Sequence, residues 1–133
     1  MIAPLSRIAV ACLWVLSAPL AAAAAEGFPF GLEMTLDVAP KPGTKRIPNI
    51  EIGDHGAARL ELWCGGGAGQ FSVAGDTVIF VPGAVARRDC PQELTAADDA
   101  LLAQLGAVTN WSRQGDVVTL TGSGSLRFHL NTN

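Results

Sequence analysis

The cysteines are the first residues of this sequence whose type and spacing could do chemistry. Cys64 and Cys90 lie in the main part of the chain, and Cys12 lies in an apolar leading segment that we expect to be removed on export. Two cysteines in an exported domain indicate a disulfide, with a metal site or a reactive thiol as alternatives. Zinc would need two further ligands, and His55 and His129 stand at no ligand spacing from the cysteines. We predict a Cys64–Cys90 disulfide and no metal site.

This disulfide would contribute a large share of the stability of a small domain. It would close a loop of 27 residues. The chain-entropy model gives such a loop a contribution of roughly 3.5 kcal/mol, against a net stability of roughly 5–15 kcal/mol.

A glycine-rich run at residues 65–69 follows Cys64 directly. Phosphate-binding loops use glycine so that backbone N–H groups can reach the anion. Here no Lys-Ser or Lys-Thr pair follows, and the next segment has the pattern of a strand rather than a helix. We therefore expect a turn or a β-bulge beside the disulfide.

Asp98 and Asp99 are a candidate carboxylate pair for acid–base chemistry. Adjacent residues of a helix diverge by about 100°, so these side chains would not converge on one substrate. We interpret them as capping residues instead, with Thr95 as the N-cap and Asp98 at the third helical position. Both carboxylates would also suit the positive end of the helix dipole.

The two histidines offer no clear catalytic arrangement. His55 is expected in a turn and His129 in the last strand, and neither has a serine or cysteine nucleophile nearby in the sequence. We predict no catalytic residues, no cofactor and no enzymatic activity.

Tryptophans and paired basic residues are the remaining candidates for binding. Trp63 and Trp111 lie in expected strands, where packing in the core or at a sheet edge is the first interpretation and a ligand-stacking platform is the alternative. We expect the basic pairs at 45–46 and 87–88 to be solvated surface rather than a phosphate site.

The first 25 residues have the three parts of a secretory signal. Met1–Arg7 is basic, Ile8–Leu16 is a short apolar run, and Ala21–Ala25 offers small residues at a cleavage site. We predict cleavage after Ala25, with Ala23 and Ala24 as neighbouring alternatives. The protein would then be periplasmic or secreted.

An uncleaved membrane anchor is the alternative interpretation of this leader. A spanning helix needs about 20 apolar residues. The stretch from Ile8 to Ala25 contains Ser17 and Pro19 and ends in weakly hydrophobic alanines. We therefore expect no stable membrane insertion after cleavage.

The mature chain, residues 26–133, has room for one domain. It would hold eight basic and twelve acidic residues, a net charge of −4. Such a chain has no general attraction for nucleic acid or anionic lipid. We expect a monomer that binds no nucleic acid.

Alternation of apolar and polar residues at period two predicts most of the fold. A helix is predicted at about 95–105, where Leu101, Leu102 and Leu105 form one apolar stripe. Residues 82–94 are predicted to form an irregular loop that contains Cys90. The expected strands are 32–37, 47–52, 58–64, 70–73, 77–81, 108–112, 117–121 and 125–130. The predicted class is α+β, a mainly antiparallel twisted sheet of six to eight short strands with one short helix packed at its edge.

The order of these features is similar to that of the META domain (HslJ-like) family of bacterial envelope proteins. The resemblance covers nearly all of residues 31–130. Its short matches are Trp63-Cys64, Gly69-Gln70-Phe71, Gly75–Phe80, Arg88-Asp89-Cys90, the acidic start of the helix, Gly115–Leu120 and Leu126-Arg127-Phe128. The family often has Gly-Cys-Asn where this chain has Trp63-Cys64-Gly65, so no role of that asparagine carries over.

The resemblance implies a strongly twisted antiparallel sheet with one helix at its edge and an exported or membrane-associated location. The family is linked to stress response, drug tolerance and virulence-related secretion, without an established activity. Our first hypothesis is a non-enzymatic envelope module whose partner is an unknown envelope protein or small ligand. The alternative is a secreted inhibitor of a hydrolase, a protease or a lysozyme, acting through the loop 82–94 pinned at Cys90.

Overall fold

The computed structural model describes residues 27–131. The predicted signal peptide, residues 1–25, and its cleavage position lie outside these described residues. No helix in the described part is long and apolar enough to cross a membrane.

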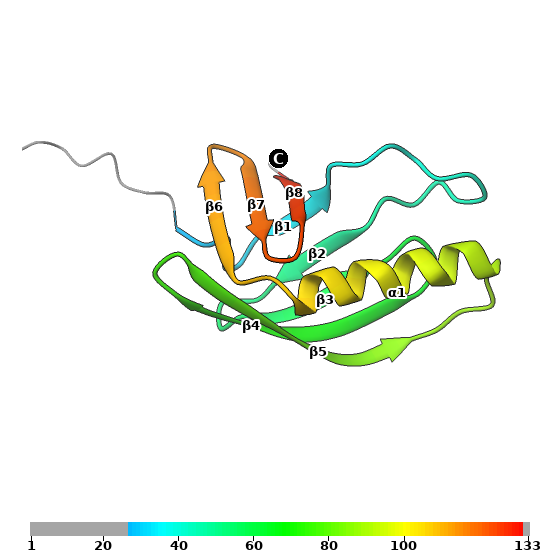
Figure 1. Ribbon diagram of the computed structural model, residues 1–133, viewed down its shortest axis with the longest axis horizontal. Coiled ribbons are helices and arrows are strands. Elements are labelled where there is room, and N and C mark those ends of the chain that lie inside the picture. Colours follow the sequence, from blue (N-terminus) through cyan, green and yellow to red (C-terminus); the bar gives the residue numbers. More distant parts are fainter. Residues whose placement is uncertain (1–26, 132–133) are drawn as a thin grey trace, which may run out of the picture.

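Eight antiparallel strands close into a barrel in which each strand pairs with the next along the chain (Figure 1). Pairing of the first strand with the last completes the ring. The strands are β1 (Glu33–Leu36), β2 (Asn49–Ile52), β3 (Ala57–Glu61), β4 (Gly66–Ala74), β5 (Thr77–Ala86), β6 (Asn110–Gln114), β7 (Val117–Thr121) and β8 (Ser125–Leu130). The predicted fold class is confirmed.

The barrel interior is built by the alternating residues that the sequence pattern identified, because successive side chains of a strand point to opposite faces. The buried strand residues are Met34, Leu36, Ile50, Ile52, Ala58, Leu60, Phe71, Val78, Phe80, Val118, Leu120, Leu126, Phe128 and Leu130. Phe28 joins this core from before β1, where its ring lies against Phe71 and Trp111.

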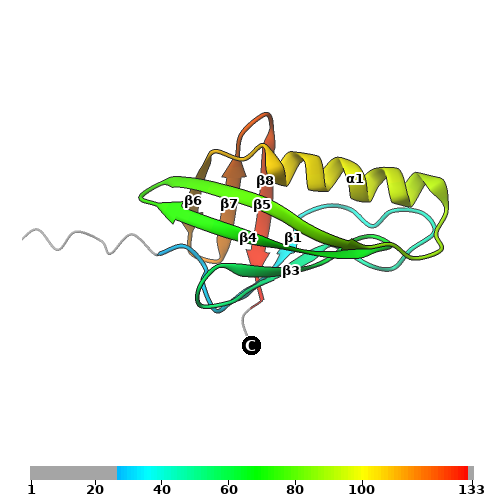
Figure 2. The ribbon, with the colours of Figure 1, turned by 90° about the horizontal axis from the view of Figure 1, so that it is seen from below.

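One helix, α1 (Gln92–Gly106), connects β5 to β6 and lies alongside β5 (Figure 2). The predicted helix at about 95–105 is confirmed, although it begins three residues earlier. The N-cap is Pro91, with no side-chain capping bond, so the assignment of Thr95 as N-cap is wrong. Proline is tolerated at a helix start, where its missing N–H costs no helical hydrogen bond.

The glycine run forms the beginning of β4 rather than a loop. β4 pairs with β5 in a register that shifts between Gly67 and Gly69, which confirms the predicted bulge. At Gly69 a Cβ atom would lie 2.3 Å from Cζ of Phe80, so the absence of a side chain lets this ring lie against the β4 backbone.

β5 is longer than predicted. It continues through Pro82 to Ala86, so the prediction of an irregular segment over 82–94 is wrong, and only residues 87–91 separate β5 from α1. Pro82 pairs with Gly69 at the register shift. A bulge tolerates proline because the ladder is already interrupted there.

We expect Gly69→Ala to destabilise the protein by about 1–3 kcal/mol, because the added methyl must displace the Phe80 ring in a packed core. Gly67→Ala is the matched control in the same strand, since a Cβ there would meet its nearest atom, the Ala84 carbonyl oxygen, at an ordinary 3.5 Å. Urea unfolding midpoints of the two variants measure the difference. Equal midpoints would contradict the close approach of Phe80 to β4.

Candidate functional site

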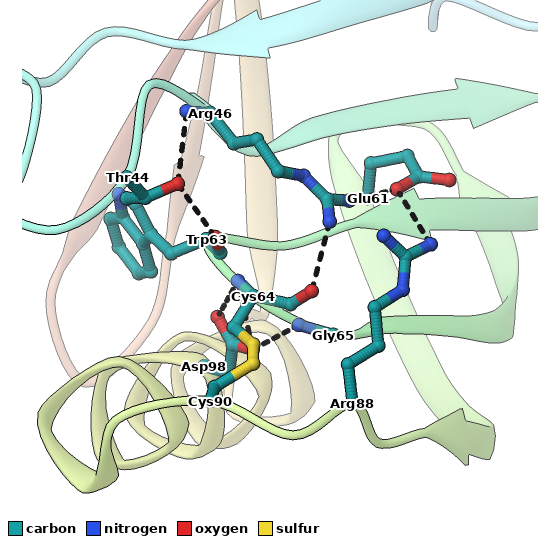
Figure 3. Close-up of polar contacts among 9 residues, drawn as sticks. All are labelled: Thr44, Arg46, Glu61, Trp63, Cys64, Gly65, Arg88, Cys90 and Asp98. Atoms are coloured by element: carbon teal, nitrogen blue, oxygen red, sulfur yellow. Dashed lines mark hydrogen bonds and ion pairs between the residues drawn. A yellow bond between two sulfur atoms is a disulfide. The ribbon is translucent and has the colours of Figure 1, made fainter.

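The disulfide between Cys64 and Cys90 joins the turn after β3 to the loop before α1 (Figure 3). The predicted pairing is therefore present, with the two Cα atoms 6.2 Å apart. The turn itself is closed by the Leu62 N–H, which donates to the Gly65 carbonyl at 2.9 Å. The bond fixes the start of the helix to the end of a barrel strand.

Asp98 reaches from α1 into the same turn. Its carboxylate accepts hydrogen bonds from the Gly65 N–H at 2.8 Å and from the Cys64 N–H at 3.3 Å (Figure 3). Asp98 is only 5% exposed, and backbone donors satisfy a carboxylate that would otherwise be costly to bury. The interpretation of Asp98 as a helix cap is wrong, because its side chain binds a different segment of the chain.

The position of Asp98 on the helix could have revealed this burial. Leu94, Asp98, Leu101 and Leu105 follow one another at spacings of four, three and four residues, and all four are buried. An apolar stripe extended back to Leu94 therefore includes the aspartate. Asp99, one position on, faces solvent and pairs with Arg87 at 3.0 Å, so the predicted divergence of the two aspartates is confirmed.

Arg46 approaches the turn from the side opposite Asp98. Its Nη1 donates to the Cys64 carbonyl at 2.9 Å, and its Nη2 pairs with Glu61 (Figure 3). The Thr44 hydroxyl donates to the Trp63 carbonyl at 3.1 Å. The expectation that residues 45–46 are only solvated surface is wrong for Arg46, which holds the long loop 37–48 against the turn.

A hollow of about 270 Å³ opens beside the disulfide, between the loop 37–48 and the loop 87–91. We call it the disulfide hollow. Trp63 and both cysteines border it, and Arg46 and Arg88 reach it from the two loops. The hydrogen bonds and the disulfide described above hold its walls in place.

The two tryptophans differ in their surroundings. Trp63 is buried, with the Lys41 Nζ 4.8 Å from its ring centroid, and its indole N–H has no hydrogen-bond partner among the described residues. Trp111 is half-buried, and its indole N–H donates to the Gly75 carbonyl at 2.8 Å. Core packing is confirmed for Trp63, which also borders the disulfide hollow.

The histidines lie away from this hollow. His55 is exposed in the turn between β2 and β3. His129 lies on the outer face of β8, with its Nε2 3.2 Å from the Asp37 carboxylate. Thr35 and Val117 are its partners across the two ladders. Among residues 27–131, no three histidine, cysteine or acidic side chains are grouped to hold a metal ion.

Comparison with known proteins identifies one family. The META domain model matches residues 33–132, a span that begins with β1 and includes α1 and every later strand. No curated protein and no solved structure gave a significant match.

We expect Asp98→Ala to destabilise the protein by about 2–6 kcal/mol, because two buried N–H groups would lose their acceptor at about 1–3 kcal/mol each. Asp98→Asn keeps one acceptor oxygen and should therefore lower the free energy of unfolding by an intermediate amount. Asp99→Ala is the control and should cost less than about 1 kcal/mol, as is usual for an exposed ion pair. Chemical unfolding of the oxidised protein measures all three. Equal losses for the two alanine variants would show that the Asp98 carboxylate does not hold the turn.

Proposed function

The chain belongs to the META domain family, and we propose that it acts as an exported, non-enzymatic module that binds or stabilises another component of the cell envelope. The observation that carries this proposal is the disulfide hollow. Its walls come from three separate segments of the chain, and a disulfide, a buried carboxylate and an arginine hold them together. A site that is ordered before binding loses little entropy when it binds.

Two features support export. A disulfide persists in oxidising compartments outside the cytoplasm, and the first 25 residues have the pattern of a secretory signal. Gly27 and Phe28, which follow closely on the predicted cleavage position, already belong to the domain. The Phe28 side chain is buried against the core, and Arg113 donates to the Gly27 carbonyl at 3.2 Å. Cleavage after Ala25 would leave these contacts intact.

The alternative, a secreted inhibitor of a protease or a lysozyme, depends on a long loop around Cys90. The structure reduces the expected loop 82–94 to residues 87–91. Arg87 at its start pairs with Asp99 at 3.0 Å, and the Arg88 Nη2 lies 3.9 Å from the Glu61 carboxylate. We therefore favour the binding module over the inhibitor.

We predict that the protein recovered from the envelope fraction has the mass of residues 26–133 less two hydrogens, for one disulfide. Neither thiol should react with an alkylating reagent until the protein is reduced, because both sulfurs are bonded. Intact mass spectrometry before and after reduction and alkylation measures both properties. A retained leader, or two thiols that react without reduction, would contradict export into an oxidising compartment.

Binding is tested on the same exported protein by cross-linking in the native envelope and capture through a C-terminal tag. A reversed charge in the disulfide hollow, Arg88→Glu, should abolish capture of a reproducible envelope component. Arg127→Glu on β8, which is not among the residues that line the hollow, should leave capture unchanged. These two arginines are comparably exposed, at 57% and 60%, so they form a matched pair. Failure of the wild-type protein to capture any reproducible component would contradict the proposal.

A further inference from the structure

The basic residues of this acidic protein are gathered at one end. Five of the eight that follow the predicted leader lie in the loops 37–48 and 87–91, which border the disulfide hollow. They are Lys41, Lys45, Arg46, Arg87 and Arg88. The same two loops hold the acidic residues Asp37 and Asp89, so together they carry a net charge of +3 in a mature chain of net charge −4, and the buried Asp98 carboxylate lies on the Cys64 turn.

The guanidinium groups of Arg46 and Arg88 share one carboxylate, that of Glu61. The Nη2 atoms of Arg46 and Arg88 both face Oε2 of Glu61, and the Arg88 atom is 3.9 Å away (Figure 3). One negative charge cannot neutralise two guanidinium ions. Asp89 is the acidic residue among the described residues that line the hollow, and it is exposed. Lys41 adds a third positive charge above the Trp63 ring.

The guanidinium groups also have unused donors. Each guanidinium carries five N–H donors. Arg46 contacts the Cys64 carbonyl and Glu61, whereas the contact of Arg88 with Glu61 is longer than a hydrogen bond. Both arginines line the hollow, and arginine matches carboxylate and phosphate geometry in a bidentate manner, so a small anion in the hollow would meet charged donors from two loops.

Trp63 supplies an apolar wall beside these charges. Its side chain is buried and borders the hollow. A site that combines an aromatic wall with a few convergent polar groups is typical of small-molecule binding.

We propose that the disulfide hollow is a subsite for the carboxylate or phosphate group of a small ligand, held by Arg46 and Arg88 against Trp63. The inference rests on the proposed binding function and names the chemistry of what is bound. The volume of about 270 Å³ lies just below the ~300 Å³ at which small-molecule pockets begin. The hollow thus fits one anionic group with a small body attached to it.

The test is a titration of the oxidised mature protein, followed through its indole N–H resonances by nuclear magnetic resonance at constant ionic strength. The two probes are inorganic phosphate and benzoate, which distinguish a phosphate from a carboxylate source. With two charge-assisted contacts we expect a dissociation constant on the order of 1 mM. The Trp63 resonance should shift and saturate, and the Trp111 resonance should stay in place because its N–H is bonded to Gly75 on a distant turn.

Two matched variants test whether the anion that shifts the Trp63 resonance binds in the disulfide hollow. Arg88→Gln removes an exposed arginine from the hollow and should weaken binding roughly 10-fold. Arg127→Gln, an arginine of similar exposure that pairs with Asp37, should bind like the wild type. An unchanged Trp111 resonance shows that each variant is folded.

Saturable binding of either probe that Arg88→Gln weakens and Arg127→Gln does not would support the inference. If neither probe saturates, or if both variants weaken binding equally, the anion subsite is ruled out. In that case, capture of an envelope component by the wild-type protein would still uphold the binding module, so the two proposals fail independently.

Discussion

The peptide unit at Cys64 is the point on which the disulfide end of the molecule depends. Its side chain is bonded to Cys90, its N–H faces the Asp98 carboxylate, and its carbonyl accepts from Arg46. These contacts bring together three segments that are distant in the sequence. The loop before β2, the turn after β3 and the helix meet at this one residue, and the disulfide hollow is formed between them.

The disulfide and the hydrogen bonds to Asp98 contribute similar amounts to the free energy of unfolding. The disulfide is worth roughly 3.5 kcal/mol by the chain-entropy model. Hydrogen bonds to a charged group contribute about 1.5–3 kcal/mol each, and Asp98 accepts two from the turn. The disulfide acts mainly by reducing the conformational entropy of the unfolded chain. The carboxylate acts in the folded state, where it accepts hydrogen bonds from the backbone N–H groups of the turn. Neither contribution replaces the other, which accounts for a charged side chain within an otherwise apolar helix face.

Local patterns in the sequence predict most of the strands well, but not their closure into a barrel, and they predict the contacts at the disulfide end poorly. Period-two alternation locates β7 and β8 to the residue, and the even cysteine pair predicts the disulfide. Asp98 was misassigned because its partners lie 33 and 34 positions away, and a local capping pattern at Thr95 offered a nearer explanation. Pro82 and Gly83 likewise indicate a loop by composition, but the bulge opposite Gly69 accommodates them within β5. These errors share a cause, which is that tertiary contacts override local signals.

The most direct test of this account is hydrogen exchange at the amides of Cys64 and Gly65 in the oxidised protein. We predict that both amides are protected in the wild type and that Asp98→Ala removes this protection while the disulfide stays intact, because the carboxylate is their acceptor. Amides on β8, far from the turn, should keep their protection in both proteins. If Cys64 and Gly65 stay protected without the carboxylate, the disulfide alone holds the turn, and the central place given to Asp98 is wrong.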